Sequence, residues 1–123
     1  MTYISPEAGD RIYQILSSSM KLCGRTVLDT CIYANYDSRN IYYRLLKGKC
    51  NNDAYIRIAI GANVPFNLFM ELLEAANIQI SPRFSKENMI LLNYIQSNST
   101  DKGADYDIDE LNGLLNEANL PPL

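Results

Sequence analysis

The sequence contains no histidine and no CxxC motif, and these absences restrict the chemistry that it can perform. Without histidine the chain lacks the commonest general base and every Ser-His or Cys-His nucleophile pair. Its cysteines, Cys23, Cys31 and Cys50, are odd in number, which favours reduced thiols over a disulfide framework or a zinc site. We therefore expect a protein that is not an enzyme, with no catalytic residue, no metal and no cofactor.

Long apolar runs are also missing. No run approaches the roughly 20 residues that span a bilayer, and the N-terminus lacks the basic and then apolar pattern of a signal peptide. Of the 123 residues, 47% are hydrophobic and 20% are charged, a composition typical of globular proteins. This length allows one sizeable core and is short for two ordinary domains. We expect a single domain, residues 1–123, in the cytoplasm and without a membrane partner.

Strand signals are weak throughout the chain. No Asn-Gly or Asp-Gly turn joins two alternating segments, and apolar residues recur at spacings of three and four nearly everywhere. The sequence therefore predicts an all-α fold of seven helices. These helices are expected to begin at Ser5-Pro6-Glu7, Thr26, Ser38, Asn52 or Asp53, Val64-Pro65, Ser85 and Asp107. The first is expected to fade at residues 17–20, the second to end near Ala34 and the third to end at about Lys47.

Capping residues carry much of this prediction. Ser5, Thr26 and Ser85 are expected N-caps, because their hydroxyl oxygens can accept from backbone N–H groups of the first turn. Asp107 and Glu110 have the spacing of a capping box. In the helix that follows Thr26, the residues expected to face inward are Val27, Leu28, Cys31 and Ile32. In the helix after Ser85 they are Met89, Leu92 and Ile95, and in the helix after Asp107 they are Ile108, Leu111, Leu114 and Leu115.

Helix ends are marked as well. Gly48 is expected to close the third helix, and Asn77 and Asn119 are expected in the left-handed conformation, each followed by an apolar residue that folds back on its helix. Pro82 should break the chain before the sixth helix. Residues 97–105 are rich in Ser, Asn and Asp and are expected to form a polar loop.

The segment 37–49, with the sequence DSRNIYYRLLKGK, divides most clearly into two faces. In a helix, Ile41, Tyr42, Leu45 and Leu46 occupy one side. The opposite arc of about 140° holds two guanidiniums, an amide, a phenol and an ammonium, the groups that bind base edges and phosphates. These belong to Arg39, Arg44, Asn40, Tyr43 and Lys47. The pattern is typical of a recognition helix, and the ordinary alternative is a solvated face without a partner.

The charge is unevenly distributed along the chain. The net charge of −3 and pI near 4.8 argue against a protein covered with nucleic-acid-binding charge. However, residues 25–49 carry 5 cations against 2 acids, whereas residues 101–123 carry 1 cation against 6 acids. The basic end can face a polyanion while the acidic end repels non-specific contact. The acidic segment lacks the ligand order of an EF-hand, so we expect a solvated loop and a helix cap there rather than a calcium site.

Residues 25–78 resemble the DNA-binding domain of lambda-repressor-like, or XRE-type, helix-turn-helix regulators. The most specific stretch is SRNIYYRLLKGK followed by AYIRIAIGANVPFNLFMELLEAANI. It looks like that family's third helix with its closing glycine, then its fourth and fifth helices. The resemblance implies a five-helix helix-turn-helix core over residues 1–80 and a C-terminal helical extension over 81–123 with two additional helices.

Carried over by position, the resemblance implies a first helix-turn-helix element at Thr26 to Ala34 and a recognition helix at about 38–47. Base contacts would come from Ser38, Arg39, Asn40, Tyr43 and Arg44. Phosphate contacts would come from Arg25, Lys47 and Lys49. The chain departs from the family in two places. A Gln usually starts the family's second helix, but this chain has Arg25-Thr26-Val27 there, and in the turn Asn35 or Tyr36 replaces the usual small residue.

The sequence thus gives a first hypothesis and two rivals. The first is a transcription regulator, bacterial or carried by a mobile element, that binds double-stranded DNA sequence-specifically, as a homodimer, with its recognition helix in the major groove. The second is a degenerate helix-turn-helix adaptor that binds a protein partner and no DNA, an idea that the acidic pI favours. A weaker third is a small-molecule sensor with a pocket near Phe66, Phe69 and Met70.

Overall fold

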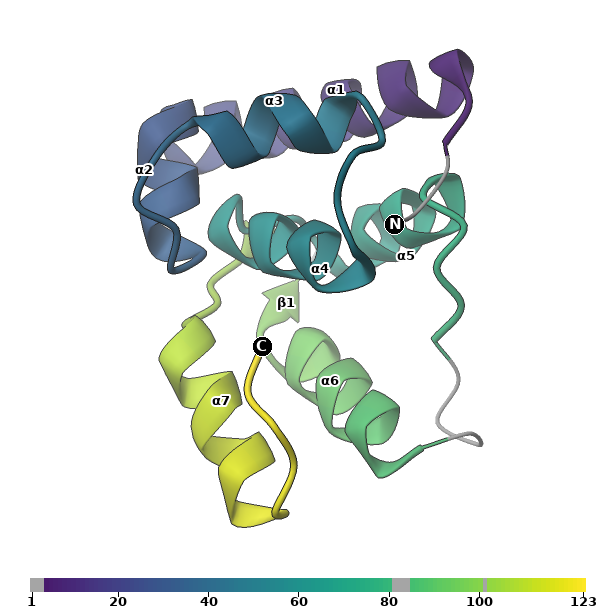
Figure 1. Cartoon of the computed structure of the whole chain (residues 1–123). Helices are drawn as coiled ribbons and strands as arrows, with labels where there is room; N and C mark the ends of the chain where they lie inside the picture. Colours follow the sequence, from purple (N-terminus) through teal and green to yellow (C-terminus); the bar gives the residue numbers. More distant parts are fainter. Residues whose placement is uncertain (1–3, 81–84, 101) are drawn as a thin grey trace.

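The structure is a computed structural model that describes residues 4–80, 85–100 and 102–123 (Figure 1). Over these residues the chain is mostly helical, which confirms the all-α prediction at that level. The elements are α1 (Pro6–Cys23), α2 (Val27–Tyr33), α3 (Asn40–Leu46), α4 (Asn52–Gly61), α5 (Phe66–Ala75), α6 (Lys86–Ser97), β1 (Ser99–Thr100), β2 (Gly103–Ala104) and α7 (Ile108–Glu117). Pro82, the expected chain break, lies outside the described residues.

The expected polar loop at 97–105 is wrong in one respect, because it contains a short antiparallel hairpin. Ser99 pairs with Ala104 and Thr100 pairs with Gly103. Gly103 has φ 140°, a conformation open to glycine, and the Thr100 hydroxyl donates to its carbonyl at 3.2 Å. The hairpin attaches the C-terminal helices to the rest of the chain, since the Ser99 hydroxyl accepts from the Phe66 N–H at the start of α5 at 2.8 Å.

The predicted N-caps are largely confirmed. The side chain of Ser5 accepts from Ala8 N, that of Ser85 accepts from Asn88 N, and Thr26 forms a reciprocal capping box with Asp29. α4 begins at Asn52, as expected, and its N-cap is Asn51. One detail differs, because Asp107 caps α7 by accepting from Asp109 N at 2.9 Å, but without the box predicted with Glu110.

Most helices end in the same way. Asn35, Asn63, Asn77 and Asn119 have φ between 53° and 64°, so the left-handed ends predicted at Asn77 and Asn119 are confirmed. In each case the next N–H donates to a carbonyl in the last turn, as in Ile78 N to Leu73 O at 2.8 Å. α1 and α3 end at Gly24 and Gly48, both with φ 72°. The fading expected at 17–20 is wrong, because Ser19 and Met20 are buried and α1 continues to Cys23.

Two of the predicted apolar faces are rotated. On α2, Leu28 is 41% exposed and Ile32 is 55% exposed, and the buried residues are Thr30 and Cys31. The reason is that α2 meets α4 through small groups: a Cβ added to Gly61 would lie 2.2 Å from the Thr30 carbonyl oxygen. This close approach turns the small side of α2 inward.

The C-terminal helices show the same kind of difference. On α6 the buried residues are Leu91, Tyr94 and Ile95, whereas Met89 is exposed. Tyr94 is held inward because its hydroxyl accepts from Asp107 N at 2.8 Å and donates to Asp107 O at 3.0 Å. On α7, Leu114 is exposed instead of buried. The remaining inward predictions for α7, Ile108, Leu111 and Leu115, are confirmed.

The arrangement of the helices leaves α3 at one side of the molecule. In Figure 1, α4 lies between α3 on one side and α6 and α7 on the other, with α1 running along α3. The core that supports this arrangement includes fully buried side chains from α1, α3, α4 and α5, among them Leu16, Leu45, Ile58 and Phe69. The C-terminal helices therefore do not cover α3.

Candidate nucleic-acid interface

The separation of α3 into two faces is confirmed. Tyr42 and Leu45 are buried, and Ile41 and Leu46 are half-buried. The opposite side forms what we call the α3 polar face, a set of exposed side chains with four cations. Its members are Arg39, Asn40, Tyr43, Arg44, Lys47 and Lys49.

The helix itself is shorter than the predicted range of 38–47. It covers Asn40–Leu46, while Ser38 and Arg39 form the turn before it. The Asn40 N–H donates to the Ser38 hydroxyl at 3.3 Å, and Arg39 is the N-cap residue with an αR backbone and no side-chain cap bond. Ser38 and Arg39 thus precede the first residue of α3, whereas Asn40, Tyr43 and Arg44 belong to the helix itself.

The cations of the α3 polar face have no acidic partner in the described part of the chain. The ion pair present there joins Arg11 of α1 to Glu71 of α5, with 2.7 Å between Nη2 and Oε1. None of Arg39, Arg44, Lys47 and Lys49 forms an ion pair among residues 4–80, 85–100 and 102–123. Their charge is therefore not neutralised by a described carboxylate and is exposed to solvent.

The buried side of α3 is anchored by specific contacts. The Tyr55 hydroxyl of α4 donates to the Leu45 carbonyl at 3.0 Å, and burial raises the pKa of Tyr55 to about 12. On the α1 side, a Cβ added to Gly9 would lie 3.1 Å from the Leu46 carbonyl oxygen, so the two helices meet with little space between them. These contacts fix α3 in one position relative to α1 and α4.

The turn between α2 and α3 is held from outside. Arg57 of α4 donates from Nε to Ala34 O at 2.9 Å and from Nη2 to Asn35 O at 2.8 Å. Its guanidinium carbon lies 3.8 Å from the centroid of the Tyr36 ring. The Asn35 amide also donates to Asp109 of α7 at 3.1 Å. Sequence reasoning missed Arg57, although a single cation within the apolar segment 54–62 is a visible signal for such a contact.

Arg25 is the one predicted DNA contact that the structure does not bring together with the others. Its Nη1 donates to the Gly61 carbonyl at 2.6 Å, and its guanidinium carbon lies 3.6 Å from the centroid of the Tyr33 ring. These contacts join the start of α2 to the C-terminal end of α4. Arg25 therefore has a structural role at this junction, and it is only half-exposed.

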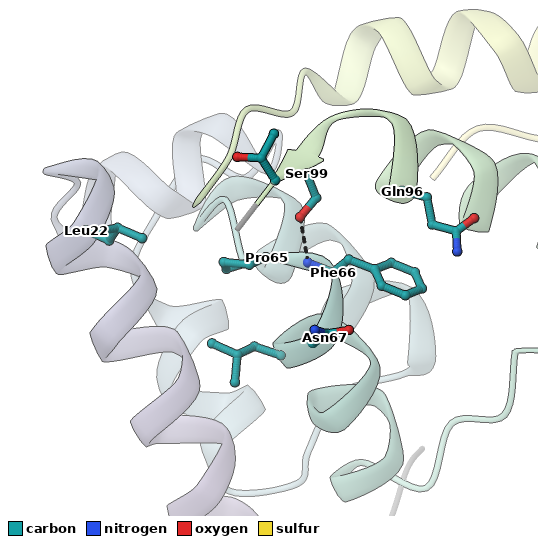
Figure 2. Close-up of a pocket in the computed structure, with 8 residues that line it drawn as sticks. Leu22, Pro65, Phe66, Asn67, Gln96 and Ser99 are labelled. Atoms are coloured by element: carbon teal, nitrogen blue, oxygen red, sulfur yellow. Dashed lines mark hydrogen bonds between the residues drawn. The ribbon is translucent and has the colours of Figure 1, made fainter. Parts of the chain in front are cut away.

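A pocket of about 580 Å³ lies away from α3, where the end of α1, the start of α5, the end of α6 and the hairpin meet (Figure 2). Phe66 lines it together with Leu22, Pro65 and Gln96. Of the residues named for a sensor pocket, Phe66 lines this pocket, Met70 lines a different depression and Phe69 is fully buried.

Other kinds of site receive no support from the described residues. Among them, no group of three or more Cys, Asp or Glu side chains is placed to hold a metal ion. None of the described helices has the length and apolar character needed to cross a membrane. Comparisons with family models, with curated proteins and with solved structures found no match.

Proposed function

We propose that this chain is a sequence-specific regulator that binds double-stranded DNA, built as a lambda-repressor-like helix-turn-helix core of α1 to α5 with α6 and α7 added. The observation that carries the proposal is the α3 polar face, whose four cations are exposed, unpaired with any described acid and uncovered by the C-terminal helices. A DNA-recognition helix needs all three properties at once.

Dimensions agree with docking in the major groove. An α-helix with its side chains is about 10–12 Å across, and the major groove of B-DNA is about 12 Å wide. In this arrangement Ser38, Arg39, Asn40, Tyr43 and Arg44 approach base edges from the N-terminal part of α3. Lys47 and Lys49, at and beyond the helix end, lie against phosphates. Two copies in a homodimer would bind half-sites about 34–36 Å apart.

The first test is a titration of the full chain against random duplex DNA at several salt concentrations. Each neutralised phosphate contributes a slope of about −0.9 to log affinity against log salt. We expect a clear negative slope for the wild type and little binding for Arg44→Glu, with Lys102→Glu as the control because Lys102 is an exposed cation on the hairpin. Equal binding by both charge reversals would remove α3 from the interface.

The adaptor remains the second candidate, and one observation favours it. Leu28 and Ile32 expose apolar side chains on α2, the helix that would lie beside the DNA backbone, and the net charge of the chain is −3. An adaptor predicts no duplex binding even at low salt. The same titration therefore separates the two functions.

A further inference from the structure

One row of side chains on α1 follows the border with α3. Gly9, Tyr13 and Ser17 are spaced four residues apart, so they share one face of α1. Gly9 lies against the Leu46 carbonyl of α3, as its 3.1 Å Cβ distance indicates. Figure 1 shows α1 running along α3, and Tyr13 lies between Gly9 and Ser17 on the face of α1 that borders α3.

On the α3 side, Tyr42 lies at this border. Burial raises the pKa of Tyr42, a hydrogen bond with Ser17 lowers it in part, and the nearby Tyr13 and Tyr43 phenols raise it again. Tyr43 packs edge-on against Tyr42, with 5.4 Å between ring centroids and an interplanar angle of 82°. Tyr13 of α1 and Tyr43 of α3 thus both lie near one buried ring.

Both of these phenols reach solvent. Tyr13 is 53% exposed and Tyr43 is 51% exposed. Burial alone therefore does not account for an aromatic residue at either position. Since Tyr43 belongs to the α3 polar face, Tyr13 extends that face across the border and onto α1. A helix in the major groove is bordered on each side by a phosphate backbone, and a phenol is a suitable donor to a phosphate oxygen.

Building on the DNA-binding function proposed above, we infer that Tyr13 contacts the sugar-phosphate backbone at the border of the major groove that α3 occupies. The interface would then include a residue of α1 that is outside the helix-turn-helix element. This contact carries no base information, because the phosphate is the same at every step. It would also release no counterion, because the phenol is neutral.

The test compares Tyr13→Phe with the wild type in duplex titrations at several salt concentrations and in hydroxyl-radical footprints. We expect affinity to fall about threefold to tenfold on every sequence, as for one lost hydrogen bond, with the salt slope unchanged and protection lost at one backbone position. Ser18→Ala is the control. Ser18 is an exposed residue of the same helix whose hydroxyl already donates to Ile15 O at 3.1 Å, and it lies on a different face of α1 from Tyr13, so its replacement should leave affinity unchanged.

The outcomes separate this inference from the function on which it rests. If Tyr13→Phe binds within twofold of the wild type while Arg44→Glu loses binding, the α1 contact is overturned and the DNA-binding function stands. If the wild type binds no duplex, both fail. A change in sedimentation on replacing Tyr13, without a change in the footprint of the bound species, would assign the residue to an interface between copies and would also overturn the inference.

Discussion

The carbonyl oxygen of Thr30 occupies the space where a side chain at Gly61 would begin, 2.2 Å from an ideal Cβ. Because this oxygen belongs to helix backbone, it cannot move aside as a flexible side chain would. We expect Gly61→Ala to separate α2 from α4 and to lower the free energy of unfolding by about 1–3 kcal/mol or more, the usual cost of overpacking. Urea denaturation followed by circular dichroism measures the change.

Gly113 provides the control for this substitution. It lies within α7, and a Cβ added there meets nothing within 4 Å. Gly113→Ala should therefore stabilise the protein by about 0.5–1 kcal/mol through helix propensity. Equal and small effects at Gly61 and Gly113 would show that α2 and α4 are not in the close contact described above.

Arg57 should be needed for the turn before α3. Its guanidinium donates to the carbonyls of Ala34 and Asn35 and covers the Tyr36 ring, and no other side chain among the described residues combines those bonds. Arg57→Lys cannot reproduce a planar fork, so we expect a loss of about 1–3 kcal/mol in urea denaturation despite the retained charge. Arg39→Lys, at an exposed residue without a described ion pair, should change stability by less than about 0.5 kcal/mol.

Tyr55 makes stability depend on alkaline pH. Its folded-state pKa is raised to about 12, above the ordinary value of 10.0. A group with a raised pKa stabilises the fold fully below its unfolded pKa, so this contribution should be lost as pH rises from about 10 toward 12. Tyr55→Phe removes the bond to Leu45 O, and we expect it to cost about 0.5–1.5 kcal/mol at neutral pH and to weaken the decline above pH 10. Thermal melts across this range measure both effects, and an identical alkaline decline in the variant would contradict the assignment.

Local signals explain why the helix boundaries were predictable. N-cap oxygens and left-handed Asn and Gly ends act within four or five residues, as at Ser5 and Asn77, so the sequence alone contains them. The exposed and buried sides of α3 were predictable for the same reason, because the helical period sorts Tyr42 and Leu45 from Arg44.

Contacts between segments that are distant in the sequence explain the features of the fold and of the site that the sequence did not predict. The inward turn of α2 depends on Gly61, which meets Thr30 only in the folded chain. The hydrogen bonds that hold Asn35 in the turn come from Arg57 of α4 and Asp109 of α7. The resemblance, carried over by position, placed Arg25 at phosphates, but its position is set by the Gly61 carbonyl and the Tyr33 ring. Charge in the sequence does not reveal which cations are used internally.

The two ends of the α3 polar face should behave differently toward DNA. Arg44 lies within α3 and can reach a base edge, whereas Lys47 follows the helix as its C-cap residue and is placed for a phosphate. With a duplex selected from a random pool, Arg44→Ala should cost about 1–3 kcal/mol and lose discrimination at one base position. Lys47→Ala should weaken binding to all sequences alike and reduce the salt slope by about one unit. Fluorescence anisotropy with the selected duplex and its single-base variants gives both quantities. If both variants lost affinity uniformly across sequences, α3 would be a backbone contact without base recognition, and the sequence-specific part of the proposed function would be wrong.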